Sequence, residues 1–385
     1  MSSKPLAGVR VLDFTRVLAG PYGTMHMADM GADVVKVEHP VHGDDTRQYV
    51  PPESGGISTY FLSVNRGKRS VALDLKDPAD RDRARALALV SDVVVENFRP
   101  GVMKRLGLDA ATLRAEKPAL VCATIRAFAD EADPRPGYDL MLQGLSGVPS
   151  ITGPVDGPPS KCGASIADMV SGMHMVQAVL AALLQRTQTG VGSHIVIPIF
   201  DAQTSLLTYH ASAFLNGGMV PQRRGNEHPS IHPFCVLETA DGWLSLCIGN
   251  DALWVRFCAA VDRPAWAADP RFITNRQRVA HRDALDALLH PLIRTRTVQE
   301  WLTLLDEAGV PAGPMSTIPQ ALEEATLVNH PHPETGTPVQ SLAAPMLFNG
   351  ERPVAERGPP ALGHHTEQVL GEWLVDTEAP GDTAT

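Results

Sequence analysis

The feature that most constrains the fold of this chain is the alternation of short apolar runs with helical segments over its first 215 residues. Residues 9–14 and Asp33–Glu38 are apolar runs, and a helical segment that opens at Pro21 lies between them. A strand, a helix and a second strand in this order form a parallel pair joined by a right-handed crossover. Further strands are expected at residues 70–75, 92–96, 120–125 and 193–200. The sequence therefore predicts an α/β fold with a Rossmann-like, doubly wound sheet.

Helix boundaries and a change of composition suggest how the chain is divided. Asp77 and Pro78 are a favoured N-cap and first-turn pair for a helix that reaches Val90. Between residues 216 and 233 glycine and proline accumulate, which indicates a crossing between domains. A hairpin at 234–248 and three helical patterns follow, as in a small α+β domain. We expect a large domain over 1–215, a small one over 216–325, and a return to the large domain over 326–385.

Charge and cysteine content limit the classes of partner. The net charge of −10 argues against binding to nucleic acid or to anionic membranes, so an anionic ligand would need a local basic pocket. The five cysteines contain no C-x-x-C pair, which favours reduced thiols. The N-terminus lacks an apolar signal region, and the longest apolar helix, at 173–184, is too short to span a bilayer. These features predict a cytoplasmic protein.

One carboxylate stands among small side chains. Asp168 lies in the segment 160–172, SKCGASIADMVSG, just before a helical run. The small neighbours would let a ligand approach the backbone closely, so Asp168 is a candidate nucleophile. Asp is also a favoured helix N-cap, and from spacing alone both interpretations stay open.

Basic residues gather around two of the predicted strands. Those at the carboxyl end of a strand in an open α/β sheet stand where ligands commonly bind, so the cluster is either a solvated face or a phosphate pocket. Its members are Arg66, Lys68, Arg69 and Lys76 around one strand and Arg99, Lys104 and Arg105 after the next.

Several common motifs are not met. Ser146 lies outside a complete G-x-S-x-G elbow, residues 18–23 do not match G-x-G-x-x-G, and no Walker-type lysine loop is present. His228 and His232 are four residues apart, but the prolines that follow each favour a loop over a metal site. His364 and His365 are expected to be solvent-exposed. No metal is predicted.

Long ordered motifs between residues 5 and 372 give the chain a family resemblance. It resembles the class III CoA transferases, the family that includes formyl-CoA and carnitine CoA-transferases and, as a related branch, α-methylacyl-CoA racemase. The motifs are LAGVRVLDFTRVLAGP at 6–21, GADVVKVE at 31–38, NRGKRS at 65–70, DVVVENFRPG at 92–101, GYD at 137–139, the Asp168 segment, RGNEHPSI at 224–231 and LGHHT at 362–366.

The resemblance implies a catalytic aspartate at Asp168, a CoA site along the first sheet and a homodimer of two interlocked, ring-like subunits. It implies no tightly bound cofactor, because CoA enters as acyl-CoA co-substrate. Tyr138 falls at a CoA-contacting position, Asp139 at an acidic position near the active site, and Leu18 where formyl-CoA transferases carry a glutamine. The other implied CoA contacts are Arg16, Val17, Ala19, His39, Leu73, Leu75, Lys76, Asn97, Phe98 and Arg105.

These positions predict an enzyme that moves CoA from an acyl-CoA, with a dicarboxylic donor such as succinyl-CoA favoured, to a carboxylic acid acceptor. Asp168 would form an aspartyl anhydride and then an aspartyl-CoA thioester, both of which stay activated. Leu18 disfavours formyl-CoA and oxalate, and the glycine-rich cover loop of formyl-CoA transferases is not evident near 248–250. An acyl-CoA racemase or epimerase with Asp168 in acid–base work is the alternative, although that branch uses a histidine at the position of Tyr138. A CoA-binding protein without catalysis is a third possibility, which the intact Asp168 segment disfavours.

Overall fold

The computed structural model describes residues 4–133 and 135–375. The chain divides into two compact units. The first contains the residues up to Val148, Cys162–Ala211 and those from Thr326 onward, and the second contains Pro149–Lys161 and Ser212–Ala325. This division differs from the predicted boundaries in assigning residues 149–161 to the second unit, although they lie within the predicted large domain.

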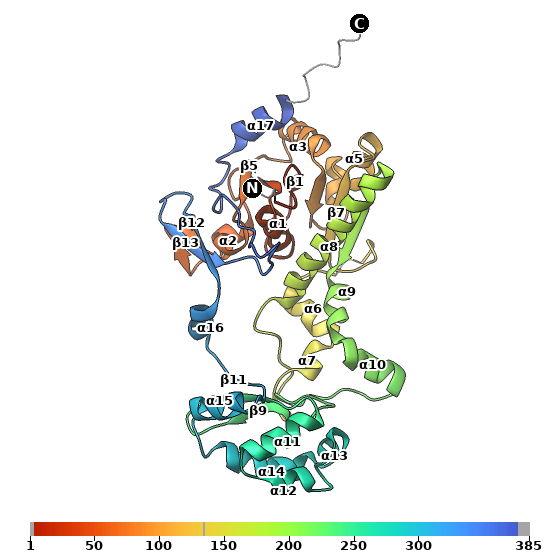
Figure 1. Ribbon diagram of the computed structural model, residues 1–385. Coiled ribbons are helices and arrows are strands. Elements are labelled where there is room, and N and C mark those ends of the chain that lie inside the picture. Colours follow the sequence, from red (N-terminus) through yellow and green to blue (C-terminus); the bar gives the residue numbers. More distant parts are fainter. Residues whose placement is uncertain (1–3, 134, 376–385) are drawn as a thin grey trace. The chain divides into compact units, whose positions relative to one another are not determined.

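Six parallel strands form the central sheet of the first unit (Figure 1). They are β1 (Arg10–Asp13), β2 (Asp33–Glu38), β5 (Lys68–Ala72), β6 (Val93–Glu96), β7 (Val121–Arg126) and β8 (His194–Pro198). Their order is β5-β2-β1-β6-β7-β8, so the chain builds outward from β1 on one side and then resumes at β6 on the other. Leu12 of β1 pairs with Val35 of β2 and with Val94 of β6. The predicted α/β fold with a parallel, doubly wound sheet is therefore confirmed.

Helices cover both faces of this sheet, and the strands are apolar on both sides as a result. Val11 and Val34 belong to a core shared with two helices, whereas their neighbours Leu12 and Val35 belong to the core on the opposite face. The first core is covered by α1 (Ala19–Asp29) and α8 (Ile166–Thr189), and the second by α3 (Pro78–Val90), α5 (Ala110–Glu116) and α17 (Thr366–Val375).

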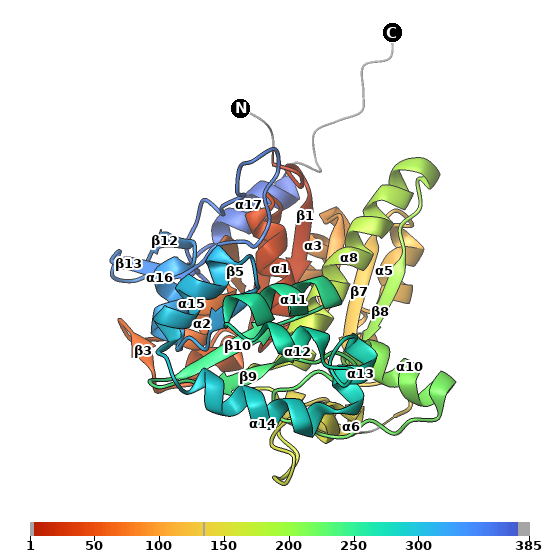
Figure 2. The ribbon, with the colours of Figure 1, turned by 60° about the horizontal axis from the view of Figure 1, so that its bottom comes forward.

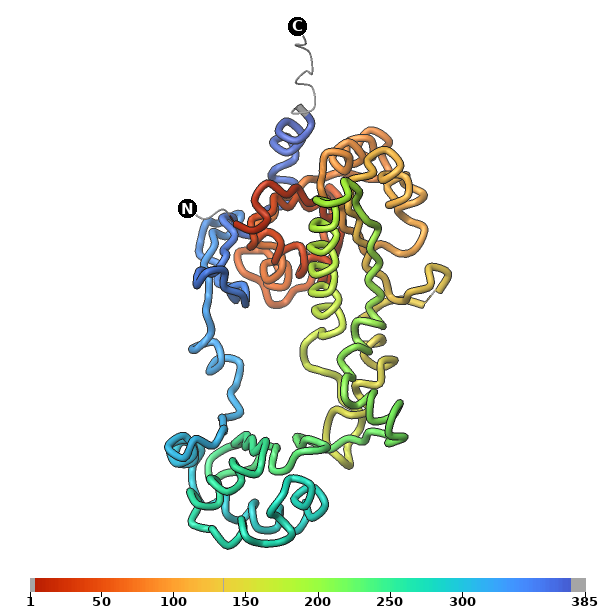
Figure 3. The backbone as a smooth tube through the Cα atoms, turned by 45° about the vertical axis from the view of Figure 1, so that its right-hand side comes forward, coloured from red at the N-terminus to blue at the C-terminus, as the bar shows by residue number. Residues whose placement is uncertain are grey.

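The C-terminal segment returns to the N-terminal part of the first unit, as the blue and red segments in Figures 2 and 3 show. On α17, Trp373 donates through its indole nitrogen to the carboxylate of Asp33 (3.0 Å). His332 Nε2 lies 2.9 Å from the carbonyl oxygen of Ser54. The remaining elements of this unit are α2 (Thr59–Val64), α4 (Val102–Leu106), α6 (Asp139–Ser146), α9 (Ile199–Thr204), the short strands β3 (Glu53–Ser54) and β4 (Ile57–Ser58), β12 (Leu327–Pro331), β13 (Pro338–Leu342), and the 3₁₀ turns Asp45–Gln48 and Ser205–Leu207.

The second unit is a small α+β structure with a core of its own, built around Trp254, Phe257 and Trp301. Its antiparallel sheet has the order β11-β10-β9, and the predicted hairpin is the β9–β10 pair. Its elements are β9 (Phe234–Glu238), β10 (Trp243–Cys247), β11 (Ala312–Pro314), α11 (Asp251–Ala260), α12 (Pro264–Ala268), α13 (Asn275–Ala280), α14 (Arg282–Ile293), α15 (Val298–Glu307) and α16 (Ile318–Glu324); α7 (Val148–Ile151) and α10 (Thr208–Gly217) lie at the boundaries.

The elements match the sequence where the local signal is strong and differ where packing decides. Asp77 caps α3 as predicted, accepting from the N–H groups of Ala79 and Asp80. The strand expected at 70–75 lies two residues earlier, at Lys68–Ala72, because buried ion pairs accommodate its charged start. Helix α8 has 24 residues, so the expectation of a helix too short to span a bilayer is wrong. By length and composition α8 could cross a membrane, and one of its faces packs against α1.

Candidate functional site

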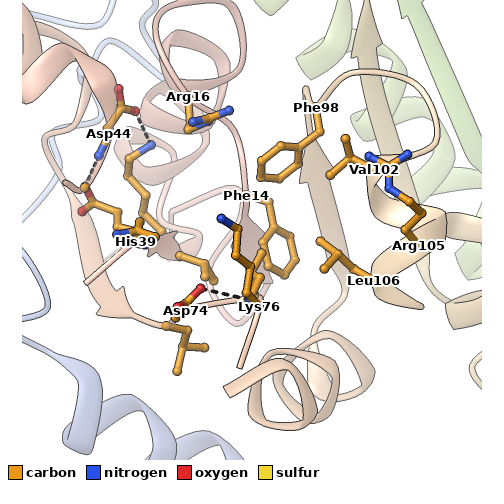
Figure 4. A pocket seen from close by; sticks show the side chains of 16 residues that line it. Phe14, Arg16, His39, Asp44, Asp74, Lys76, Phe98, Val102, Arg105 and Leu106 are labelled. Carbon is orange, nitrogen blue, oxygen red and sulfur yellow. Dashed lines mark hydrogen bonds and ion pairs between the residues drawn. The ribbon is translucent and has the colours of Figure 1, made fainter. Parts of the chain in front are cut away.

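A cavity of about 410 Å³ lies at the carboxyl ends of the strands, beside the neighbouring strands β1 and β6 (Figure 4). We call this place the β1–β6 switch, because the chain adds strands on one side of β1 and then continues with β6 on the other. This is the position at which open α/β sheets bind ligands. Seven of the eleven predicted CoA contacts line it: six come from the loops after β1, β2, β5 and β6, and one lies on α4. They are Arg16, His39, Leu73, Leu75, Lys76, Phe98 and Arg105.

The charges in this cavity suit an anionic ligand. The side chains of Lys76 and Arg105 are exposed, and neither has a carboxylate within salt-bridge distance in the described part of the chain. Arg16 lies over the ring of Phe98 (5.1 Å) and 3.6 Å from Asp45, with nearly half of its side chain exposed. Cations that lack an internal partner are available to phosphate oxygens.

The other basic residues of the predicted cluster do not line this cavity. Each of its members on or beside β5 is buried in an ion pair: Arg66 with Asp29 (2.7 Å), Lys68 with Asp13 (3.1 Å) and Arg69 with Asp33 (2.5 Å). Arg99 and Lys104 line an adjoining cavity of about 350 Å³, separated from the first by Phe98, which faces both. Only Lys76 and Arg105 of the cluster line the cavity at the β1–β6 switch.

Asp168 lies in the first turn of α8, but it does not cap that helix. The N-cap is Ser165, whose side chain makes no capping bond. The cap comes from another helix instead: Asp139, the first residue of α6, accepts a hydrogen bond from the N–H of Ala167 (3.0 Å). Gln143 fixes Asp139 through a second bond (2.8 Å). The helix-cap interpretation of Asp168 is therefore wrong, because Asp139 fills that role.

The electrostatics of Asp168 are unusual for a carboxylate. Burial, and next the negative charge of Asp139, raise the pKa of Asp168 from 3.8 to about 7. Within the described chain its carboxylate receives no hydrogen bond that would offset this desolvation. A weakly solvated carboxylate is a better nucleophile than an ordinary one once it is ionised. Asp168 therefore has the properties of an activated nucleophile.

A close helix contact places Asp168 near the loop that follows β1. Gly172, one helical turn after Asp168, lies so near α1 that a Cβ atom there would collide with the carbonyl oxygen of Ala19. Further along, Gly23 of α1 faces Met175 of α8. The two helices therefore advance in the same direction from this contact, and the first turn of α8 lies toward the start of α1. Asp168 consequently stands near the loop from Arg16 to Leu18.

Tyr60, whose ionisation is affected by Asp168, was missed by the sequence analysis, as was its neighbour Tyr49. Burial, and next the charge of Asp168, raise the pKa of Tyr60 on α2 to about 12. Tyr60 packs edge-on against Tyr49 (5.6 Å between ring centroids), and both line a cavity of about 650 Å³ with the prolines of residues 51–52. Neither tyrosine has a spacing or motif that marks it: Tyr60 is identified by the effect of the Asp168 charge on its pKa, and Tyr49 by its packing against Tyr60.

The other predicted contacts do not line the cavity at the β1–β6 switch. Leu18 is the N-cap position of α1 and Ala19 its first residue. Val17 has a left-handed backbone (φ 69°), and Asn97 hydrogen-bonds the backbone of Arg16. Tyr138 precedes α6, with 72% of its surface exposed.

The cysteines and the histidines singled out in the sequence do not form a second reactive or metal-binding site in the described residues. Burial raises the pKa values of the Cys122, Cys235 and Cys258 thiols to about 12, so none of these is a ready nucleophile. His232 is buried 3.1 Å from Asp286, and no cluster of three metal-ligating side chains occurs within residues 4–133 and 135–375. His365 is half-buried rather than exposed: its Nδ1 accepts from Ser70 N–H, and burial lowers its pKa to about 4.

Comparison with known proteins decides the family. The sequence model of CoA-transferase family III matches residues 6–366. The chain belongs to the family III CoA-transferases. This class III transferase resembles a succinate–glutarate CoA-transferase of Agrobacterium fabrum (39% identity; 96% of this chain and 95% of the relative). It also resembles an acetyl-CoA:oxalate CoA-transferase of Acetobacter aceti (40% identity; 82% of each).

The fold of this CoA-transferase agrees with that of a solved family structure. A CAIB/BAIF family protein from Brucella suis superposes with a TM-score of 0.84 at 36% identity, covering 97% of this chain and 100% of the other. The predicted family and enzyme class are thus confirmed.

Proposed function

We propose that this CoA-transferase moves CoA from a dicarboxylic acyl-CoA, such as succinyl-CoA, to a carboxylic acid through covalent intermediates on Asp168. The observation that carries the proposal is the poorly solvated Asp168 carboxylate, with its pKa raised to about 7, beside the loop whose Arg16 lines the cationic cavity. In this arrangement Lys76 and Arg105 hold the phosphates of CoA, and the apolar Leu73 and Phe98 contact its less polar parts.

The covalent steps follow from the chemistry of a carboxylate nucleophile. An oxygen of Asp168 attacks the thioester carbonyl carbon, the C–S bond breaks, and a mixed anhydride and CoA thiolate form. The thiolate attacks the aspartyl carbonyl carbon, releases the donor acid and leaves an aspartyl-CoA thioester. The acceptor carboxylate attacks the carbonyl carbon of this thioester, the C–S bond breaks, and a second anhydride and CoA thiolate form. The thiolate then attacks the acceptor acyl carbon of this anhydride and displaces the Asp168 carboxylate. This last step frees Asp168 and the new acyl-CoA.

The names of relatives support a dicarboxylic substrate. The Agrobacterium fabrum relative is named for succinate and glutarate. The Acetobacter aceti relative is named for oxalate, so the exclusion of oxalate that we drew from Leu18 stays a prediction to be measured. The racemase alternative is disfavoured because the relatives of this chain carry transferase names and because Tyr138 replaces the histidine of that branch.

Apolar side chains on α10 support the proposed homodimer. Tyr209, Phe214 and Leu215 are 53%, 54% and 76% exposed, which is an unusual surface for a helix that faces only water. A second subunit interlocked with the first would cover this face. The high pKa values of the Cys122, Cys235 and Cys258 thiols are compatible with the reduced cytoplasm that we propose as its compartment.

Trapping the covalent intermediate tests the mechanism. The protein is incubated with succinyl-CoA and then with hydroxylamine, and the modified peptide is located by mass spectrometry. We expect a hydroxamate on Asp168 and none in the Asp168→Asn variant. Modification at another residue, or exchange of the α-hydrogen with solvent deuterium without CoA transfer, would contradict the proposal.

A further inference from the structure

The loop after β1 is fixed by side chains rather than by other backbone. The N–H of Thr15 donates to Asp13 Oδ1 (2.9 Å), and the carbonyl oxygen of Thr15 accepts from Lys36 Nζ (2.6 Å). The N–H of Val17 donates to Asp44 Oδ1 (3.2 Å). Every one of these partners is buried.

Asn97 completes this arrangement from the other side of the switch point. Its Oδ1 accepts from the N–H of Arg16 (2.9 Å), and its Nδ2 donates to the carbonyl oxygen of the same residue (2.8 Å). The amide therefore bonds both backbone groups of one residue, as a neighbouring β-strand would. Because these bonds employ one acceptor and one donor of the amide, its orientation is set by Arg16.

A buried ion pair holds two of the residues that bond the 15–17 loop. Lys36 Nζ lies 2.7 Å from Asp44 Oδ2, and both side chains are fully buried. The charge of Lys36 and the bonds from Thr46 outweigh burial and lower the pKa of Asp44 to about 2, so Asp44 stays ionised as the acceptor for Val17. The loop clamp, as we call Asp13, Lys36, Asp44 and Asn97, thus bonds five consecutive backbone groups of residues 15–17.

The clamp holds Val17 in an unfavourable backbone conformation. Val17 is β-branched, yet its φ is 69°, in the left-handed region that residues with a Cβ atom disfavour. Strain of this kind persists only where the surroundings fix it. Released from the clamp, Val17 would move toward negative φ, and Arg16 and Leu18 on either side would move with it.

We propose that the loop clamp positions the Arg16–Leu18 loop between the CoA cavity and Asp168, and that Asn97 is a positioning residue rather than a contact of CoA. Arg16 lines the cavity, and Leu18 leads into α1 where Gly172 brings α8 close. Asn97 lies outside the lining of that cavity, since its amide is turned to the Arg16 backbone. The clamp therefore fixes the distance between bound CoA and the nucleophile. This inference rests on the proposed role of Asp168.

The variants Asn97→Ala and Arg105→Ala separate positioning from ligand contact. For Asn97→Ala we expect kcat with succinyl-CoA and glutarate to fall by about tenfold or more, since small misplacements of reacting groups are costly. Because Lys76 and Arg105, the proposed phosphate contacts, are outside the clamp, displacement of Arg16 alone should raise the Kd for CoA, from titration calorimetry, by no more than about threefold. Arg105→Ala loses a phosphate contact, so its Kd should rise by about tenfold. Because Asn97 is half-buried at the surface, the variant is expected to fold, and its unfolding midpoint checks this.

Amide hydrogen exchange gives a readout independent of the substrate. Peptides that cover residues 15–18 should exchange faster in Asn97→Ala than in the wild type, whereas peptides that cover β7 should be unchanged. If the wild type lacked transfer activity, the proposed function would be wrong. The hydrogen-exchange and CoA-binding data would still test whether the clamp positions the loop. A weakened CoA Kd with normal kcat, or unchanged exchange at residues 15–18, would overturn the positioning role.

Discussion

Replacing Asp168 by asparagine removes a carboxylate that the fold holds in a poorly solvated place. The side chain keeps its size, so the change isolates the charge. Because the carboxylate is the proposed nucleophile, transfer should be lost at every pH. Because its pKa is raised from 3.8 to about 7 in the folded protein, the same substitution should make the fold more stable at neutral pH.

The size and sign of this stabilisation follow from proton linkage. Between pH 3.8 and about 7 the folded protein binds more protons at Asp168 than the unfolded chain does, so wild-type stability decreases as pH rises through this window. A shift of about three pKa units corresponds to an upper bound of roughly 4 kcal/mol. Partial exposure of the side chain reduces this, and we expect roughly 1–2 kcal/mol above pH 7 and about zero near pH 4.

Thermal unfolding without ligand, measured from pH 4.5 to 8.5, tests this reasoning. At roughly 2–4 °C per kcal/mol, the Asp168→Asn midpoint should exceed that of the wild type by a few degrees at pH 8. The difference should shrink toward acid pH. Asp82→Asn, on the exposed face of α3, makes the same change of charge at a solvated position and is the control. A variant less stable than the wild type at pH 8, or a difference independent of pH, would refute the argument.

Other substitutions test neighbouring parts of the site. Gly172→Ala inserts a methyl group against the α1 backbone, so it should destabilise the fold by roughly 2 kcal/mol and lower kcat. Gly144→Ala on α6 is the control, because its methyl group meets open space and the change should be neutral or slightly stabilising. Thermal unfolding and transfer rates of the two variants test this. Asp139→Asn removes a negative charge that raises the pKa of Asp168, so the midpoint of the pH–rate profile should move to lower pH, and an unmoved midpoint would contradict the coupling. Lys76→Ala should raise the Kd for CoA and weaken its dependence on salt, as calorimetry at two ionic strengths would show.

The parts of the fold that could be predicted are those coded by nearby residues. Strand β2 has the predicted bounds, and Asp77 caps α3 as its position before a proline suggested. The β3–β4 hairpin was missed because its strands have two residues each, and the β12–β13 pair lacks a local signal; the hydrogen bond between His332, just after β12, and Ser54 of β3 joins residues 278 apart. No local period marks such an element.

The same limit applies to the site. The family motifs led to Lys76, Arg105 and Asp168, but the basic residues of β5 were assigned to the wrong role. Lys68 is bound by Asp13, whose distance along the chain hides the pairing. Tyr60 is linked to the site only by the effect of the Asp168 charge on its pKa, which no local sequence pattern indicates.

The Asp168 environment also shows why a local rule fails at this site. A carboxylate in the first turn of a 24-residue helix would ordinarily be stabilised by the helix dipole, by roughly 0.3–1 kcal/mol, and its pKa would fall. Here the pKa rises to about 7, so burial and the charge of Asp139 outweigh the dipole. Asp139 on α6 already accepts a hydrogen bond from the N–H of Ala167 in the first turn of α8, so Asp168 does not supply this cap. A poorly solvated carboxylate that costs the fold stability fits the nucleophilic role that we propose for Asp168.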